Sequence, residues 1–227
     1  MIRIAGVYTA WMSILTAGCL FSGCATKPPA SSPRGSGSRD ACDILDGMSP
    51  KVKTLLDHYP SAAVLLSNTC SSVVAGKTAR LYYFYDPYTN RPSAFHSYAG
   101  ANGVTIAVRE NQSAWDQYLG LLFEIINSSN QPKFTRLALQ AERGKLSRGD
   151  FPVRVLELEH QAVLRTRELV VGLGLASSEF VDSVLYKRLL NSPNRFDEFL
   201  AYVQQPENKR NPLLEYQQQY DQNKNAH

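Results

Sequence analysis

The hydrophobic and polar positions are most clearly patterned between Trp115 and Asn127, where the sequence reads WDQYLGLLFEIIN. At about 100° per residue, apolar side chains fill most of a helix surface and the polar positions form one stripe. The residues of this stripe are Ser113, Asp116, Gln117, Gly120, Glu124 and Asn127. The pattern predicts an amphipathic helix that is capped by Asn111 or Ser113 and exposes Glu124 and Asn127 to solvent.

Two strands are predicted ahead of this helix. Residues 78–85 are rich in aromatic side chains and residues 104–108 read VTIAV, and both compositions are typical of strands. The intervening segment 88–103 contains several Gly, Pro and Asn residues, which predict an exposed, turn-rich loop. The aromatic residues of this region form either a ligand platform or, as we favour, a half-covered sheet face: Tyr82, Tyr83, Tyr85, Tyr88, Phe95 and Tyr98.

Apolar residues at helical spacing predict further helices on both sides. Their expected starts are Ser49-Pro50, Phe134, Asp150 as an N-cap, Ser177, and Ser192 as an N-cap before Pro193. Past Gln204 the chain is polar except for Leu213, Leu214 and Tyr216, so a frayed tail over 205–227 is predicted. The pattern therefore indicates an α+β fold, with a small sheet followed by a helical half, in one domain over 41–204.

The first 23 residues have the layout of a secretory signal. Arg3 precedes an apolar run from Ile4 to Phe21, and small residues precede Cys24. Thr and Ser residues interrupt this run, which disfavours a transmembrane anchor. The tetrad Phe21-Ser22-Gly23-Cys24 resembles the lipobox of bacterial lipoproteins, which implies that Cys24 is lipidated and becomes the new N-terminus. A competing tetrad that ends at Cys19 leaves a shorter apolar region.

The lipoprotein resemblance also implies a location. Residues 24–40 are rich in Pro, Ser and Gly and predict a flexible tether. Ala25, rather than Asp, follows Cys24, and in lipoproteins of this kind that favours the outer membrane. The expected arrangement is a periplasmic domain that is bound to the membrane through acyl chains, including palmitate, on Cys24.

The two remaining cysteines, Cys42 and Cys70, are expected to form a disulfide. An exported chain with two thiols most simply pairs them, and the bond would contribute about 3 kcal/mol by closing a loop. The alternative is a catalytic thiol, but Cys70 has neither a CxxC partner nor a neighbouring His in the sequence.

Charge and composition exclude other classes. The chain has 227 residues, 44% of them hydrophobic, and a net charge of +4 that is spread along its length, so no nucleic-acid partner is expected. The segment SSVVAGKT ends like a phosphate-binding loop, but Ser71 occupies the position where that motif needs Gly.

One motif resembles a catalytic zinc-binding sequence. Phe123-Glu124-Ile125-Ile126-Asn127 occupies the place of the His-Glu-x-x-His motif, and with the preceding strands it resembles the zincin metallopeptidases. The resemblance implies a cleft along this helix and a further ligand on a later helix. Phe123 cannot bind a metal and Asn127 is a poor zinc ligand, so we expect a degenerate site without metal or cofactor.

Glu159 and His160 are the other candidates, because both fall in apolar arcs of the predicted helix that starts at Asp150. They form either a core ion pair, with Arg136, Arg154 or Arg167 as partners, or a catalytic or ligand group together with Glu124. The leading hypothesis is a noncatalytic lipoprotein that binds another protein, in one concrete form an immunity protein against a secreted toxin. The alternatives are an atypical metal-dependent hydrolase that uses Glu124 with Glu159 and His160, and a structural lipoprotein of the envelope.

Overall fold

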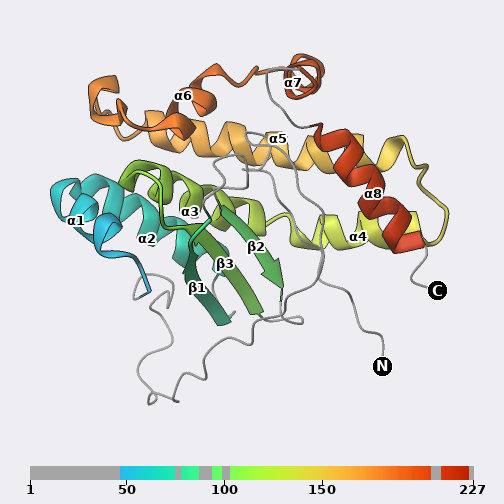
Figure 1. Ribbon diagram of the computed structural model, residues 1–227, viewed down its shortest axis with the longest axis horizontal. Coiled ribbons are helices and arrows are strands. Elements are labelled where there is room, and N and C mark those ends of the chain that lie inside the picture. The colour runs from blue at the N-terminus through green and yellow to red at the C-terminus, as the bar shows by residue number, and fades with distance from the viewer. Residues whose placement is uncertain (1–46, 75–77, 87–93, 99–102, 206–210, 225–227) are drawn as a thin grey trace.

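The structure is a computed structural model that describes residues 47–74, 78–86, 94–98, 103–205 and 211–224 (Figure 1). The predicted signal, the tether, Cys24 and Cys42 lie outside the described residues. Within them, a small sheet is followed by a helical half, which confirms the α+β class. No described helix is both long and apolar enough to cross a membrane.

Along the described part of the chain, helices come before and after the three strands of the sheet. They are α1 (Pro50–His58), α2 (Pro60–Val74), β1 (Thr78–Phe84), β2 (Ala94–Tyr98), β3 (Gly103–Arg109), α3 (Ala114–Ser128), α4 (Gln131–Glu142), α5 (Asp150–Val171), the 3₁₀ helix η2 (Ser177–Phe180), α6 (Val184–Asn191), α7 (Phe196–Val203) and α8 (Pro212–Lys224).

The sheet has the strand order β1-β3-β2. β3 lies in the middle, parallel to β1 and antiparallel to β2, and His96 of β2 is opposite Ile106 of β3. The predicted strands at 78–85 and 104–108 are confirmed. The prediction that 88–103 is entirely a loop is wrong, because β2 lies within it. Its five residues, AFHSY, are too few to give a clear alternating pattern between turn-forming neighbours.

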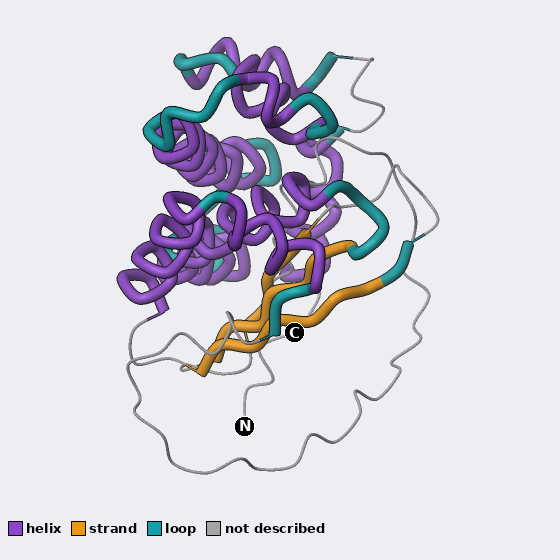
Figure 2. Tube along the Cα trace, turned by 90° about the vertical axis from the view of Figure 1, so that its left-hand side faces the viewer, coloured by secondary structure: helices purple, strands orange, loops and turns teal. Residues whose placement is uncertain are grey.

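The described helices are stacked in layers on one face of the sheet (Figures 1 and 2). α3 packs directly on β2 and β3, α5 packs on α3, and α6 and α7 pack on α5. The largest fully buried side chains come from several of these layers: Tyr118, Phe123, Phe134, Phe151, Phe180 and Phe199. Burial of such aromatic side chains is the main source of stability in a core of this kind.

α3 is the central helix, and its surroundings correct one prediction. Ser113 caps it, since the Asp116 backbone N–H donates to Ser113 Oγ at 3.1 Å. Glu124 and Asn127 were expected on a solvated stripe, but both are fully buried. The reason is that α3 contacts strands on one side and α1, α2, α5 and α6 on others, so its polar stripe faces protein rather than water.

Several predicted helix starts differ from the structure. α4 begins at Gln131 rather than at Phe134, and the helix expected from Ser177 is divided into η2 and α6. Asp150 is the first residue of α5 and not its N-cap, and its backbone N–H donates to Ser147 Oγ at 3.0 Å. Ser192 does not cap the next helix, because its hydroxyl donates backwards to the Arg188 carbonyl at 2.9 Å. α7 therefore begins only at Phe196.

The segment beyond Gln204 was expected to be frayed, and this is wrong for residues 212–224. They form α8, which packs against α4 and α5 and buries Tyr216 and Tyr220. The tyrosines are four residues apart and therefore lie on the same face of the helix. Two such anchors are a weak signal in an otherwise polar stretch.

Candidate functional site

A buried His–Glu pair joins the sheet to the central helix. Nδ1 of His96, on β2, lies 2.5 Å from Oε2 of Glu124, on α3, and neither side chain is exposed to solvent. The pairing follows from the fold, because α3 covers the face of the sheet formed by β2 and β3. From the sequence, His96 was placed in a segment predicted to be a loop and was not expected to be a partner of Glu124.

Burial governs the electrostatics of this pair. Desolvation raises the pKa of the Glu124 carboxyl, while the hydrogen bond and the charge of His96 act in the opposite direction. Either side chain can carry the proton of this hydrogen bond. The pair can therefore hold a proton between two side chains, neither of which is exposed to solvent.

Asn127 lies one turn after Glu124 on the same helix. Both atoms of its amide group, together with Oε1 of Glu124, are buried without a hydrogen-bond partner in the structure. Unpaired buried polar atoms cost free energy, and in many proteins an ordered water binds to them. Asn127 is thus part of a polar region inside the core, not of a solvated helix face.

Glu159 of α5 is buried and accepts a hydrogen bond from the Tyr216 hydroxyl of α8. Two of the arginines expected to pair with it have other partners. Arg154 donates to Glu157 and Arg167 donates to the Ser192 carbonyl. The partner from α8 could not be foreseen while that segment was predicted to be frayed.

His160 has a structural environment on the neighbouring side of α5. Its Nε2 lies 2.8 Å from the Pro193 carbonyl oxygen, which can only accept, so this nitrogen carries the proton. Its ring stacks on Phe199 with centroids 4.4 Å apart. These contacts hold α7 and the segment before it against α5.

The three candidate residues are therefore engaged in different places. Glu124 pairs with the sheet, Glu159 with α8, and His160 with the segment before α7. Within the part of the chain that the structure describes, no three His, Cys, Asp or Glu side chains are grouped so that they could hold a metal ion. The ligand set of Glu124, Glu159 and His160 that a metal-dependent hydrolase would need is not assembled.

Asp116 is a structural residue that the sequence pattern misplaced on the solvated stripe. It is buried, and its Oδ1 accepts hydrogen bonds from Ser183 Oγ at 2.6 Å and from the Leu185 backbone N–H at 2.9 Å. Ser183 in turn caps α6, because it accepts from the Tyr186 N–H at 3.0 Å. One carboxylate of α3 thereby fixes the start of α6.

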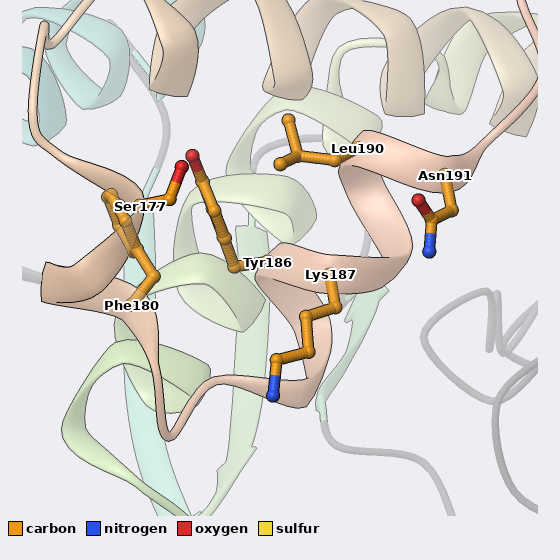
Figure 3. Close-up of a pocket in the computed structure, with 6 residues that line it drawn as sticks. All are labelled: Ser177, Phe180, Tyr186, Lys187, Leu190 and Asn191. Atoms are coloured by element: carbon orange, nitrogen blue, oxygen red, sulfur yellow. The ribbon is translucent and has the colours of Figure 1, made fainter.

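A shallow hollow of about 190 Å³ lies on the surface beside α6 and η2 (Figure 3). The rings of Phe180 and Tyr186 are stacked in its wall with centroids 3.9 Å apart, and Ser177 lies next to them. Lys187 and Asn191 extend from α6 at its side. Three aliphatic side chains are exposed on the same segment: Val181 63%, Val184 50% and Leu190 41%.

The cysteine and tyrosine predictions are only partly covered by the described residues. Cys70 is buried in α2 and does not belong to a strand region, and its predicted partner Cys42 lies outside the described residues, so their disulfide stays a prediction. Tyr82 and Tyr85 are exposed and Tyr83 is partly buried. Tyr88 lies outside the described residues, as do the side chains of Phe95 and Tyr98.

No protein-family model matches this chain, and neither the curated proteins nor the solved structures include a significant match to it.

Proposed function

We propose that this protein is a membrane-tethered periplasmic lipoprotein that acts without catalysis, by binding another protein. The tethering part rests on the lipobox-like tetrad before Cys24 and on the Pro-, Ser- and Gly-rich segment that follows it. The binding part rests on two observations: the candidate carboxylates are buried, and apolar side chains near α6 are exposed.

The burial of the candidate catalytic residues supports a binding role over catalysis. Glu124 and Glu159 are fully buried, and each is hydrogen-bonded to another protein side chain. A general acid or base must come within hydrogen-bond reach of its substrate. Neither carboxylate is exposed to solvent, and the hydrogen bond that each makes holds two elements of the fold together.

The observation that carries the proposal is the exposed apolar surface of η2 and α6. Leu190 lines the hollow together with Phe180 and Tyr186, and the exposed Val181 and Val184 lie in the chain between these two aromatic residues. Exposed aliphatic residues next to an aromatic depression are typical of protein interaction sites. We call this set of five residues the α6 surface.

The experiment is cross-linking in intact cells followed by capture of the full chain. A double variant, Val181→Glu with Val184→Glu, places two charges on the α6 surface. Val184 is the first residue of α6, where an acidic side chain is well tolerated, and Val181 is already 63% exposed. Val64→Glu is the matched control, because Val64 is 59% exposed but lies on α2. The wild type and the control should retain the same protein and the double variant should lose it. Equal capture by all three chains, or no specific capture by any, would refute the proposal.

The tether is tested separately. Metabolic labelling with palmitate should mark the wild-type chain and leave a Cys24→Ser variant unlabelled. Labelling that persists in this variant would contradict lipidation at Cys24.

The immunity form of the proposal names a secreted toxin as the bound protein. It predicts that cells without this chain are sensitive to that toxin, and that the wild-type chain, but not the Val181→Glu/Val184→Glu variant, restores resistance.

A further inference from the structure

α8 is attached to the protein in a different way from the longer core helices. α3 and α5 bury many aliphatic side chains, whereas the buried residues of α8 are Pro212, Tyr216 and Tyr220. They recur every four residues and so form one narrow stripe on a helix whose other residues are polar, apart from Leu213 and Leu214. Tyrosine anchors on a polar segment are typical of interfaces between separate surfaces.

The surface that receives α8 offers a partner for each of these anchors. The Tyr216 hydroxyl donates to the buried Glu159 carboxylate of α5. The Tyr220 hydroxyl donates to the Leu146 carbonyl at 3.1 Å, and its ring packs against Phe151 with centroids 5.9 Å apart. We call this surface, formed by Leu146, Arg148, Phe151 and Glu159, the α8-docking face.

An ion pair at the edge of the α8-docking face orients α8. Arg148 Nε lies 2.9 Å from Asp221 Oδ1, and its Nη2 lies 2.9 Å from Asp221 Oδ2. This forked geometry fixes the register of the helix as well as its position. The two side chains are 54% and 44% exposed, so they can be changed without opening the core.

We propose that the α8-docking face also accepts α8 from a second copy of the chain, by reciprocal exchange of residues 211–224 between two copies. The second copy is the occupant because its α8 carries the same hydroxyl, ring and carboxylate groups that the face already binds. Exchange keeps every contact of α8 and replaces only the chain to which it is connected. It uses a surface on α5 and the α4–α5 connection, and does not depend on the α6 surface.

The number of residues between α7 and α8 sets the concentration at which exchange occurs. α7 ends at Val203 and α8 begins at Pro212, so α8 stays near its own face at an effective concentration on the order of 1 mM. Exchange between unmodified copies is therefore expected when the chain is concentrated to about that level. A change that weakens the contact of α8 with its own docking face, but not with the docking face of the other copy, should allow exchange at lower protein concentrations.

A charge-swap experiment with two full-length variants weakens the contact of α8 within each copy and keeps its contact between the copies. Arg148→Asp sets two acidic side chains against each other within one chain, and Asp221→Arg sets two basic side chains against each other within the other chain. When the variants are mixed and exchange α8, opposite charges meet at both docking faces. Native mass spectrometry of the mixture, with one variant isotopically labelled, should show mixed dimers enriched on the order of tenfold over the dimers of either variant alone.

Two controls separate exchange from other association. The double variant Arg148→Asp/Asp221→Arg restores opposite charges within one chain and should be as monomeric as the wild type. Adding Tyr216→Phe to the Asp221→Arg chain removes the hydroxyl that reaches Glu159 and should reduce the mixed dimer. The proposal is overturned if the mixture is no more dimeric than its components, or if the double variant dimerises as strongly as the mixture.

Discussion

Glu124 and His96 hold the central helix and an edge strand together through one contact of 2.5 Å, from which solvent is fully excluded. Twenty-eight residues separate them in sequence, so the contact closes the segment that contains β2 and β3. The pair therefore ties the position of β2 to the rotation of α3 about its axis.

Truncating this pair should be costly. Glu124→Ala leaves the His96 imidazole without its carboxyl partner and creates a cavity, so we expect the free energy of unfolding to fall by about 3–5 kcal/mol. Glu124→Gln keeps a hydrogen-bonding group of the same size and should lose less. Urea denaturation measures both. Glu168→Gln, on the exposed side of α5, is the control that should change stability by less than about 0.5 kcal/mol.

The same carboxyl should give stability a pH dependence. Burial raises the pKa of Glu124 above its ordinary value of 4.5, so the folded chain binds this proton more tightly than the unfolded chain. The stabilising contribution is present below pH 4.5 and is lost as pH rises through the raised pKa, with a slope of at most about 1.4 kcal/mol per pH unit. Urea titrations over a pH series should show this component in the wild type. Its persistence in the Glu124→Gln variant would contradict the assignment.

Replacing Asn127 should have the opposite sign from most core substitutions. Its buried amide atoms have no partner, so Asn127→Leu removes an unfavourable group at similar volume and should stabilise the fold by about 1 kcal/mol. Asn130→Leu is the matched control, because the Asn130 amide donates to the Leu158 carbonyl at 3.2 Å and its loss should destabilise. Thermal melting compares the two variants. A lower melting temperature for Asn127→Leu would show that the amide has an ordered partner such as water.

Asp116 should matter for the second half of the fold. Asp116→Ala leaves the Ser183 hydroxyl and the Leu185 N–H without their acceptor, so a loss of about 2–3 kcal/mol is expected. Hydrogen exchange should rise in α6 before it rises in α3. Asp197→Ala, at an exposed position, should leave exchange in α6 unchanged. Equal exchange in both variants would remove this role from Asp116.

The sequence predicted helices and strands better than it predicted which of their side chains are exposed to solvent. The two longer strands, the central helix and the Ser113 cap follow from residue type and period alone, and they are confirmed. Exposure does not follow from period, because a polar stripe predicts solvent only when no other element covers it. α3 is covered by strands and helices from both ends of the chain, so Glu124 and Asn127 are buried.

For the candidate site, the sequence predicted which residues are buried but not which residues they contact. Burial of Glu159 and His160 follows from their place among apolar residues of α5. Their partners do not, because Tyr216 and Pro193 lie 57 and 33 residues away, and His96 lies in a five-residue strand. Contacts between distant segments depend on topology, which a single helical or strand period does not encode.

The contact between Tyr216 and Glu159 also bears on the order in which the molecule can fold. Glu159 and Tyr216 are 57 residues apart in the sequence, on α5 and α8, so the hydroxyl donor reaches the carboxylate only when α8 packs against α5. The inner carboxylate of α5 stays open to water until that step. Completion of this part of the core therefore waits for the docking of a helix from a distant part of the chain.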